Sequence, residues 1–269
     1  MSQAVNLYDG AYENYESETY REIRTETYGE DYGQTSWVTT DESEEIPQLL
    51  ALKADSSVLE IGCGSGGYAL HLAEKIGCRI LGLDVNVPGI RNANRLAAVK
   101  NLVSRARFED QDVSRTLPLN DGSFDAVFSN DVLCHLPDRA DILREMFRVT
   151  RPGGRMLFSD ALIIGGTVSY QELTIRSSIG FYMYSPPGEN ERLIEEAGFR
   201  LVRVSDTTQD AASIAKRWHD AREKRKARLI AIENEPTFEG LQRFLASVFK
   251  LCSERRLLRY CYVTDKAAS

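Results

Sequence analysis

The feature that most constrains the fold of this chain is an alternation of short apolar runs with amphipathic helical patterns between about residues 55 and 205. The apolar runs are bounded by Gly or Asp and are nearly continuous, which is typical of strands buried in a parallel sheet. Strands and helices that alternate in this way predict a parallel α/β sheet with helices on both faces. The expected strands are residues 57–62, 78–84, 124–130 and 154–160, with 106–112 as a weaker edge strand and another within 189–206.

The regions outside this alternation differ from it in composition. Residues 1–35 hold six of the twelve tyrosines and eight acidic residues, too aromatic a composition for a disordered tail. We therefore expect an N-terminal helical lid over residues 1–45 and a core over 46–269. The core should carry helical cap insertions at about 162–188 and 208–255, before a final strand at 257–265.

One helical segment of the second insertion, residues 216–228, has seven basic side chains against two acidic ones. Because the whole chain is acidic, we expect this segment to face the acidic N-terminal region. An anionic partner is the alternative interpretation.

Composition excludes several classes of function. With 269 residues and 42% hydrophobic residues, the chain can bury a sizeable core, and its net charge of -7 argues against a nucleic-acid-binding protein. No apolar run approaches the ~18 residues of a membrane span, and the N-terminus lacks a secretory signal pattern. The five cysteines follow no metal-binding spacing, so we expect no metal site and a cytoplasmic protein with reduced thiols.

A glycine-rich loop follows the first expected strand. "EIGCGSGG" places Gly62, Gly64 and Gly67 in GxGxxG spacing before a helix, whose first N–H groups can bind an anionic ligand group. Asp84 ends the second strand, where its carboxylate can accept hydrogen bonds from both hydroxyls of a ribose. Taken alone, this pair predicts a nucleotide cofactor.

Two further carboxylates favour a methyl donor over a nicotinamide dinucleotide. Glu60 stands two residues before the first glycine, where it could orient the donor's ammonium group, and Asp112 follows the third strand, where it could accept the adenine amino group. Only one half of a dinucleotide fold is present.

At these residues the sequence resembles class I S-adenosylmethionine-dependent methyltransferases. Four motifs occur in order: "VLEIGCGSGG", "LGLDVN", "QDVSRTLPLNDGSFD" and "RVTRPGGRMLFSD". The resemblance implies a Rossmann-like, seven-stranded mixed sheet whose last strand is antiparallel, with S-adenosylmethionine as cofactor. The implied cofactor-binding residues are Glu60, Gly62, Cys63, Gly64, Asp84, Val85, Asp112, Val113 and Asn130.

His135, one of only three histidines, follows the fourth strand in "FSNDVLCHLPD". The carboxyl ends of the strands form the ligand-binding edge of such a sheet. A neutral imidazole there could take a proton from an acceptor nitrogen or oxygen. Asp131, four residues earlier, would share a helical face with it and could orient the imidazole or hold a substrate ammonium. A structural role for His135 is the alternative, and it is the expected role of His71 and His219.

This segment is also similar, more narrowly, to phosphoethanolamine and glycine/sarcosine N-methyltransferases. That similarity implies that a lid tyrosine pairs with the histidine, and Tyr15 is the first candidate, with Tyr20 next. Two departures, at Ala161 and Gly180, argue against a phosphorylated substrate. Tyr20, Tyr182 and Tyr184 are the expected substrate-binding residues.

The sequence therefore predicts a methyltransferase that moves a methyl group from S-adenosylmethionine to a nitrogen or oxygen of a small molecule. His135 is the candidate base, and Asp131 and Tyr15 are its candidate partners. A non-catalytic S-adenosylmethionine-binding protein and a nicotinamide-dependent oxidoreductase remain as alternatives.

Overall fold

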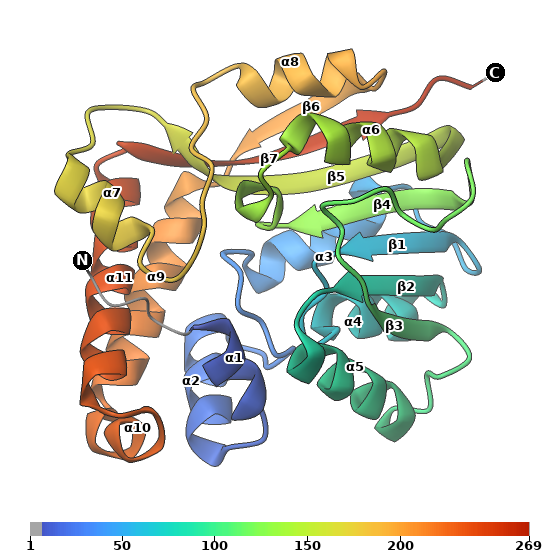
Figure 1. The fold of residues 1–269 in the computed structure, drawn as a ribbon. Helices are drawn as coiled ribbons and strands as arrows, with labels where there is room; N and C mark the ends of the chain where they lie inside the picture. Colours follow the sequence, from blue (N-terminus) through green and yellow to red (C-terminus); the bar gives the residue numbers. More distant parts are fainter. Residues whose placement is uncertain (1–6, 269) are drawn as a thin grey trace.

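A computed structural model describes residues 7–268 of the chain. Within this range the strands form one mixed sheet of seven, in the order β3-β2-β1-β4-β5-β7-β6 (Figure 1). β7 runs antiparallel to both of its neighbours, and the other pairings are parallel. The expected sheet and its antiparallel last strand are confirmed. The strands are β1 (Ser57–Ile61), β2 (Arg79–Asp84), β3 (Ala106–Asp110), β4 (Phe124–Asn130), β5 (Thr150–Ile164), β6 (Arg200–Asp206) and β7 (Leu257–Asp265).

Helices cover both faces of the sheet because each has one apolar side to bury. On one face, α3 (Thr40–Leu49), α4 (Gly67–Ile76) and α5 (Val87–Val99) pack over residues of β1 to β3. On the other, α6 (Arg139–Val149) and α8 (Glu189–Glu196) pack over β4, β5 and β7. The strand expected at 154–160 is longer than predicted, since β5 begins directly after α6 and continues to Ile164.

A third cluster of buried hydrophobic residues lies outside the two layers that cover the sheet. The N-terminal helices α1 (Tyr8–Glu13) and α2 (Glu18–Tyr28) pack there against the insertion between β6 and β7 (Figure 1). That insertion comprises α9 (Thr208–Glu223), α10 (Lys226–Glu233) and α11 (Glu235–Ser253), while α7 (Tyr170–Arg176) follows β5. The helical insertion expected before the last strand is therefore present. The boundary expected between residues 45 and 46 falls inside α3, a continuous helix with a capping box at Thr39.

The basic segment faces the acidic N-terminal region, as expected. Arg225 forms ion pairs with Glu22 at 2.7 Å and Glu26 at 2.8 Å, and Lys224 and Arg228 pair with the same two carboxylates. These contacts join α2 to the turn between α9 and α10. Arg228 also lies 3.7 Å from Glu18.

All five cysteines are free thiols, and Cys63, Cys78, Cys134 and Cys252 are buried. Within residues 7–268, no helix combines the length and apolar character needed to cross a membrane.

Candidate active site

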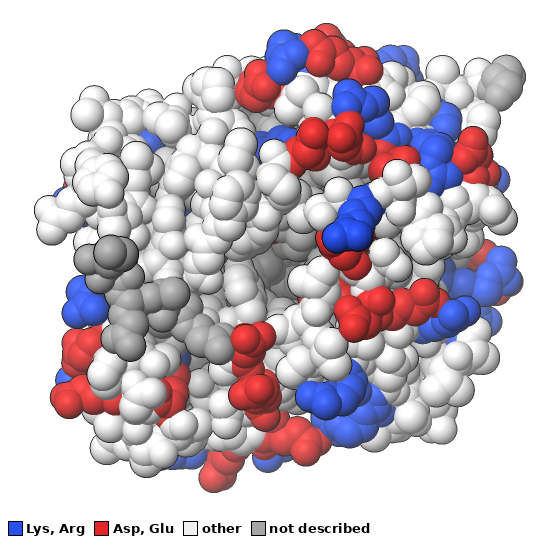
Figure 2. All heavy atoms as spheres, viewed as in Figure 1, with Lys and Arg blue, Asp and Glu red and all other residues white. Residues whose placement is uncertain are grey.

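A cavity of about 540 Å³ lies at the carboxyl ends of the central strands. The arrowheads of β1 and β4 point toward the side on which α1, α2 and α7 lie (Figure 1). This face of the molecule is hollowed near its centre, and the side chains that border the hollow are mostly uncharged (Figure 2). The lining brings together most of the predicted cofactor and catalytic residues: Glu60, Gly62, Cys63, Gly64, Asp84, Val85, Asp112, Val113, Asn130, Asp131 and His135.

The glycine loop between β1 and α4 forms one wall. Gly62 and Gly64 have φ values of 74° and 52°, a left-handed conformation that side-chain-bearing residues seldom adopt. A Cβ at Gly62 would overlap Val132, and one at Gly64 would overlap the Tyr12 hydroxyl. The loop therefore needs glycine both for its turn and for the close approach of the lid.

Asp84 holds this loop from the end of β2. Its carboxylate accepts hydrogen bonds from the backbone N–H groups of Gly64 and Asn86, each at 2.8 Å. Burial raises the pKa of Asp84, and those N–H groups partly oppose the shift. A carboxylate has about four acceptor positions, so capacity remains for two ribose hydroxyls.

Among the residues that the structure describes, four in the cavity wall have a buried polar side-chain atom without a hydrogen-bond partner: Glu60 Oε2, Ser65 Oγ, Asn130 Nδ2 and Arg176 Nη1. Glu60 is 1% exposed, and burial, followed by repulsion from Asp84, holds its pKa well above its usual value. Unsatisfied buried polar groups are costly, which points to a ligand that pairs with them. The ammonium of S-adenosylmethionine fits the Glu60 carboxyl, and an acceptor atom of the donor fits the Asn130 amide.

The residues predicted to bind adenine, Asp112, Val113 and Val85, line the same cavity. Asp112 accepts hydrogen bonds from the Ser114 backbone N–H at 2.9 Å and hydroxyl at 2.6 Å, which lower its pKa and keep it ionised. Val113 is buried, whereas Val85 is 61% exposed at the cavity, an apolar surface available to a flat base. The residues present therefore fit S-adenosylmethionine.

His135 ends the 3₁₀ turn η1 (Leu133–His135) after β4. Its Nδ1 atom lies 3.1 Å from the Phe181 carbonyl oxygen, and its Nε2 atom lies 3.0 Å from the Tyr8 hydroxyl. Since a carbonyl can only accept, Nδ1 carries the proton, and Nε2 of the neutral ring accepts from Tyr8. Burial lowers the pKa of His135 to about 4. The imidazole is therefore neutral, with its unprotonated nitrogen toward the lid.

The expectation that Asp131 orients this imidazole is wrong. Asp131 has a φ of 60°, so the segment is not a helix on which residues 131 and 135 would share a face. Its Oδ1 atom accepts from the Arg259 Nε at 2.8 Å and the Ser159 hydroxyl at 2.9 Å, and its Oδ2 atom accepts from the Trp37 N–H at 2.9 Å. The carboxylate lines the cavity but is already neutralised by Arg259.

The prediction that Tyr15 pairs with His135 is wrong, because Tyr8 occupies that position. Tyr15 lies in the turn after α1, with the Arg24 guanidinium 4.4 Å from its ring centre. Tyr20 is also outside the cavity, where its hydroxyl donates to Glu233 at 2.9 Å.

Of the two tyrosines expected on the opposite wall, only Tyr182 lines the cavity, and its ring lies 4.4 Å from the His135 ring. The Tyr184 hydroxyl instead meets the Ser177 hydroxyl at 2.9 Å, away from the lining.

Sequence reasoning missed Tyr8, Tyr12 and Arg176, which all line the cavity. Tyr8 and Tyr12 are four apart and share one face of α1. Arg176 is the only Lys or Arg between residues 156 and 191, and this isolation is the signal that could have identified it.

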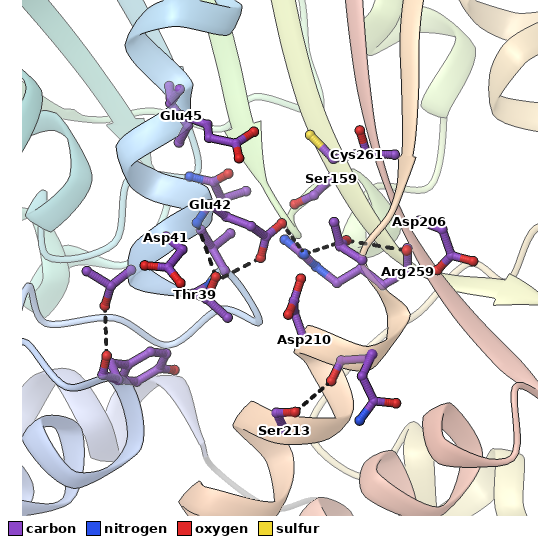
Figure 3. A pocket seen from close by; sticks show the side chains of 18 of the residues that line it. Thr39, Asp41, Glu42, Glu45, Ser159, Asp206, Asp210, Ser213, Arg259 and Cys261 are labelled. Atoms are coloured by element: carbon purple, nitrogen blue, oxygen red, sulfur yellow. Dashed lines mark hydrogen bonds and ion pairs between the residues drawn. The ribbon is translucent and has the colours of Figure 1, made fainter.

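A second cavity, of about 940 Å³, lies between α3, α9 and strands β5 to β7 (Figure 3). Asn130 lines both cavities, and the buried Arg259 stands at the boundary between them. The Arg259 Nη1 atom donates to Glu42 and to the Thr207 hydroxyl, each at 2.7 Å, while Nε bonds Asp131. Arg259 therefore links three parts of the chain: α3 through Glu42, the residue after β4 through Asp131, and the junction between β6 and α9 through Thr207.

Comparisons with known proteins agree with this geometry. Residues 59–158 match the family model of a methyltransferase domain. The chain is 30% identical over 201 residues to phosphoethanolamine N-methyltransferase 1 of Zea mays, a match covering 74% of this chain and 38% of that protein. It is 28% identical over 213 residues to 27-O-demethylrifamycin SV methyltransferase of Amycolatopsis mediterranei, covering 77% of this chain and 78% of that protein.

The fold is similar to that of Haemonchus contortus phosphoethanolamine N-methyltransferase 2, solved with phosphomonomethylethanolamine and S-adenosylhomocysteine. The TM-score is 0.80 at 20% identity, covering 97% of this chain and 60% of that one. The chain spans about two fifths of the length of the plant phosphoethanolamine N-methyltransferases that it matches. Residues 59–158 thus have the sequence pattern of a methyltransferase domain, and the cavity beside them is lined by residues that fit S-adenosylmethionine.

Proposed function

We propose that this protein transfers a methyl group from S-adenosylmethionine to a nitrogen or oxygen atom of a small molecule, with His135 as the general base. The observation that carries the proposal is the unprotonated Nε2 of a half-buried neutral imidazole, 3.0 Å from the Tyr8 hydroxyl, in the wall of the donor cavity. One relative is named as an N-methyltransferase and another acts, by its name, on an oxygen. Both names support these two classes of acceptor atom.

The donor, when bound, supplies a methyl group on a positively charged sulfur, which is already activated for displacement. The protein's contribution is then mainly positioning, which can supply roughly 7–11 kcal/mol of the barrier. Asp84 would hold the ribose, and Glu60 the ammonium. The glycine loop between them would fix the donor against the sheet edge.

The remaining task is to remove a proton from the acceptor. The Tyr8 hydroxyl donates to Nε2 of His135, so an acceptor N–H or O–H that donates to the Tyr8 oxygen can lose its proton through Tyr8 to His135. The imidazole accepts that proton, and the Phe181 carbonyl keeps hold of Nδ1–H. General-base catalysis of this kind contributes roughly 10²–10⁴-fold to a rate.

The test separates donor binding from proton removal. Calorimetric titration should show S-adenosylmethionine binding to the wild-type protein, and Asp84→Asn should weaken it roughly 10- to 100-fold through loss of charge-assisted hydrogen bonds. His135→Gln should keep the donor affinity but lower formation of S-adenosylhomocysteine by about 10²-fold or more.

His71→Gln is the matched control. His71 lies on α4 and pairs with Glu44 at 2.7 Å, outside the cavity lining, so both readouts should stay at the wild-type level. Donor binding without turnover on any nitrogen or oxygen acceptor would favour a non-catalytic binding protein. Full turnover in His135→Gln would return this histidine to a structural role.

A further inference from the structure

Arg176, the last residue of α7, lines the donor cavity although it is only 1% exposed. Its Nη1 atom is buried and has no hydrogen-bond partner among residues 7–268. α7 is itself firmly anchored, since Ser169 caps its first turn and Glu172 pairs with Arg256 at 2.7 Å. The guanidinium is therefore held at the cavity wall by a fixed helix.

Arg176 differs from every other buried arginine that the structure describes. Each of the other four forms an ion pair with a carboxylate: Arg24 with Asp31, Arg139 with Asp160, Arg222 with Glu233, and Arg259 with Asp131 and Glu42. Burial is the largest single influence on the pKa of Arg176 and lowers it, while the neighbouring Tyr182, Tyr184 and Cys134 raise it; none of these largest influences comes from a carboxylate, and residues 1–6 contain no acidic side chain. A buried, uncompensated charge is expensive, so its presence calls for an explanation.

Aromatic rings surround the guanidinium. Its carbon lies 4.7 Å from the ring centre of Tyr182, 5.1 Å from that of Phe244 and 5.8 Å from that of Trp37. The Tyr182 ring also lies 4.4 Å from the ring of His135. The Tyr182 ring therefore contacts both the guanidinium of Arg176 and the imidazole of the candidate base.

We propose that Arg176 binds a carboxylate of the acceptor, an inference that rests on the proposed methyl transfer and names its substrate class. A carboxylate matches a guanidinium in shape and can accept two parallel hydrogen bonds from it. A phosphate dianion fits less well. Among the described lining residues, Arg176 is the only Lys or Arg, and it faces a cavity with the carboxyl groups of Glu60, Asp84, Asp112 and Asp131.

The first experiment compares two probes of the same shape, benzoate and neutral benzamide, on the full chain loaded with S-adenosylhomocysteine. Calorimetry and thermal shift should show benzoate binding roughly 10- to 100-fold more tightly than benzamide, the range expected for hydrogen bonds between charged groups. Inorganic phosphate should bind more weakly than benzoate. Equal binding of benzoate and benzamide would overturn the proposal, and tighter binding of phosphate would overturn the choice of a carboxylate.

The second experiment separates a binding role from a packing role. Arg176→Met removes the charge and keeps much of the volume, so it should abolish the preference for benzoate while leaving the unfolding temperature unchanged or higher. Arg176→Lys should keep part of the preference. A fall of many degrees in Arg176→Met with an unchanged benzoate preference would show that the arginine serves only the packing of the aromatic rings.

The two proposals fail in different ways. If the protein did not bind S-adenosylmethionine or turned over no acceptor, the proposed methyl transfer would fail, whatever benzoate does. If it turned over acceptors that lack a carboxylate as well as their carboxylate-bearing counterparts, for example tyramine as well as tyrosine, methyl transfer would stand and the role of Arg176 would fall.

Discussion

The two cavities that meet at Asn130 each contain a fully buried arginine, and the two arginines are held in opposite ways. Arg259 is paired with two carboxylates from distant parts of the chain, whereas Arg176 has aromatic rings around it and its Nη1 atom has no hydrogen-bond partner within residues 7–268. Removing one partner from a buried ion pair is costly because it leaves the other charge unpaired. The comparison teaches that Arg259 is part of the framework, and that Arg176 has a charge left for a ligand.

The largest effect should follow from Arg259→Met. This change leaves the Asp131 carboxylate buried without its cation and frees Glu42, so it should lower the free energy of unfolding by about 3–5 kcal/mol. Denaturant-induced unfolding measures the loss. Arg176→Met is the matched control, with the same pair of residue types and equal burial, and should lose little or nothing. Equal losses in both variants would break the comparison.

A smaller effect concerns pH. Burial is the main cause that lowers the pKa of His135 to about 4, and the charge of Arg176 lowers it further, against the Phe181 carbonyl and the carboxylates of Asp131 and Asp160. The free imidazole titrates near ~6.5, so between these values the unfolded chain binds a proton that the folded chain does not. Stability is therefore lost as the pH falls below about 6.5, by roughly 1 kcal/mol at about pH 5.5.

The effect of the Arg176 charge on the pKa of His135 can be measured directly. An NMR titration of the His135 ring should give a higher pKa in Arg176→Met than in the wild-type protein, since a nearby positive charge has been removed. A pKa that stays the same or falls would mean that the guanidinium does not act on the base. Above about pH 6.5 the neutral state of His135 should persist, so this group should cause no change in turnover there.

The smallest effect should come from a surface arginine. Arg225→Gln breaks ion pairs with Glu22 and Glu26, which join α2 to the α9–α10 turn. Because these carboxylates are partly exposed, the loss in free energy of unfolding should be about 0.2–1 kcal/mol and should shrink as salt is added. Urea unfolding at low and high salt measures it. A loss as large as that of Arg259→Met would show that burial is not what distinguishes the pairs.

The framework of the fold could be predicted because it depends on periodic apolar patterns. β1, β2, β4 and their helices follow directly from short apolar runs that alternate with helical spacing, and Gly62, Gly64 and Asp84 follow from a loop that only these residue types can form. The contact between the basic segment 216–228 and α2 was also predictable, because the two segments carry opposite charges.

The acceptor side was harder to predict, and the reason is local backbone geometry. α1 ends at Glu13, so Tyr15 lies in the turn that follows and not on the helix that brings Tyr8 to His135. Asp131 adopts a left-handed conformation that a non-glycine residue seldom takes, which breaks the expected spacing to His135. The role proposed for Arg176 depends on its having no carboxylate partner among the described residues, which only three-dimensional contacts reveal.

The position of β7 has a consequence for how the chain is made. β7 lies between β5 and β6 in the sheet, yet it is the last of the described strands to leave the ribosome. Until β7 emerges, β6 has no neighbouring strand among the described residues. Asp131 and Glu42 also lack their ion-pair partner, the Arg259 guanidinium. The wall between the two cavities should therefore close late, after the donor-binding half has had time to fold.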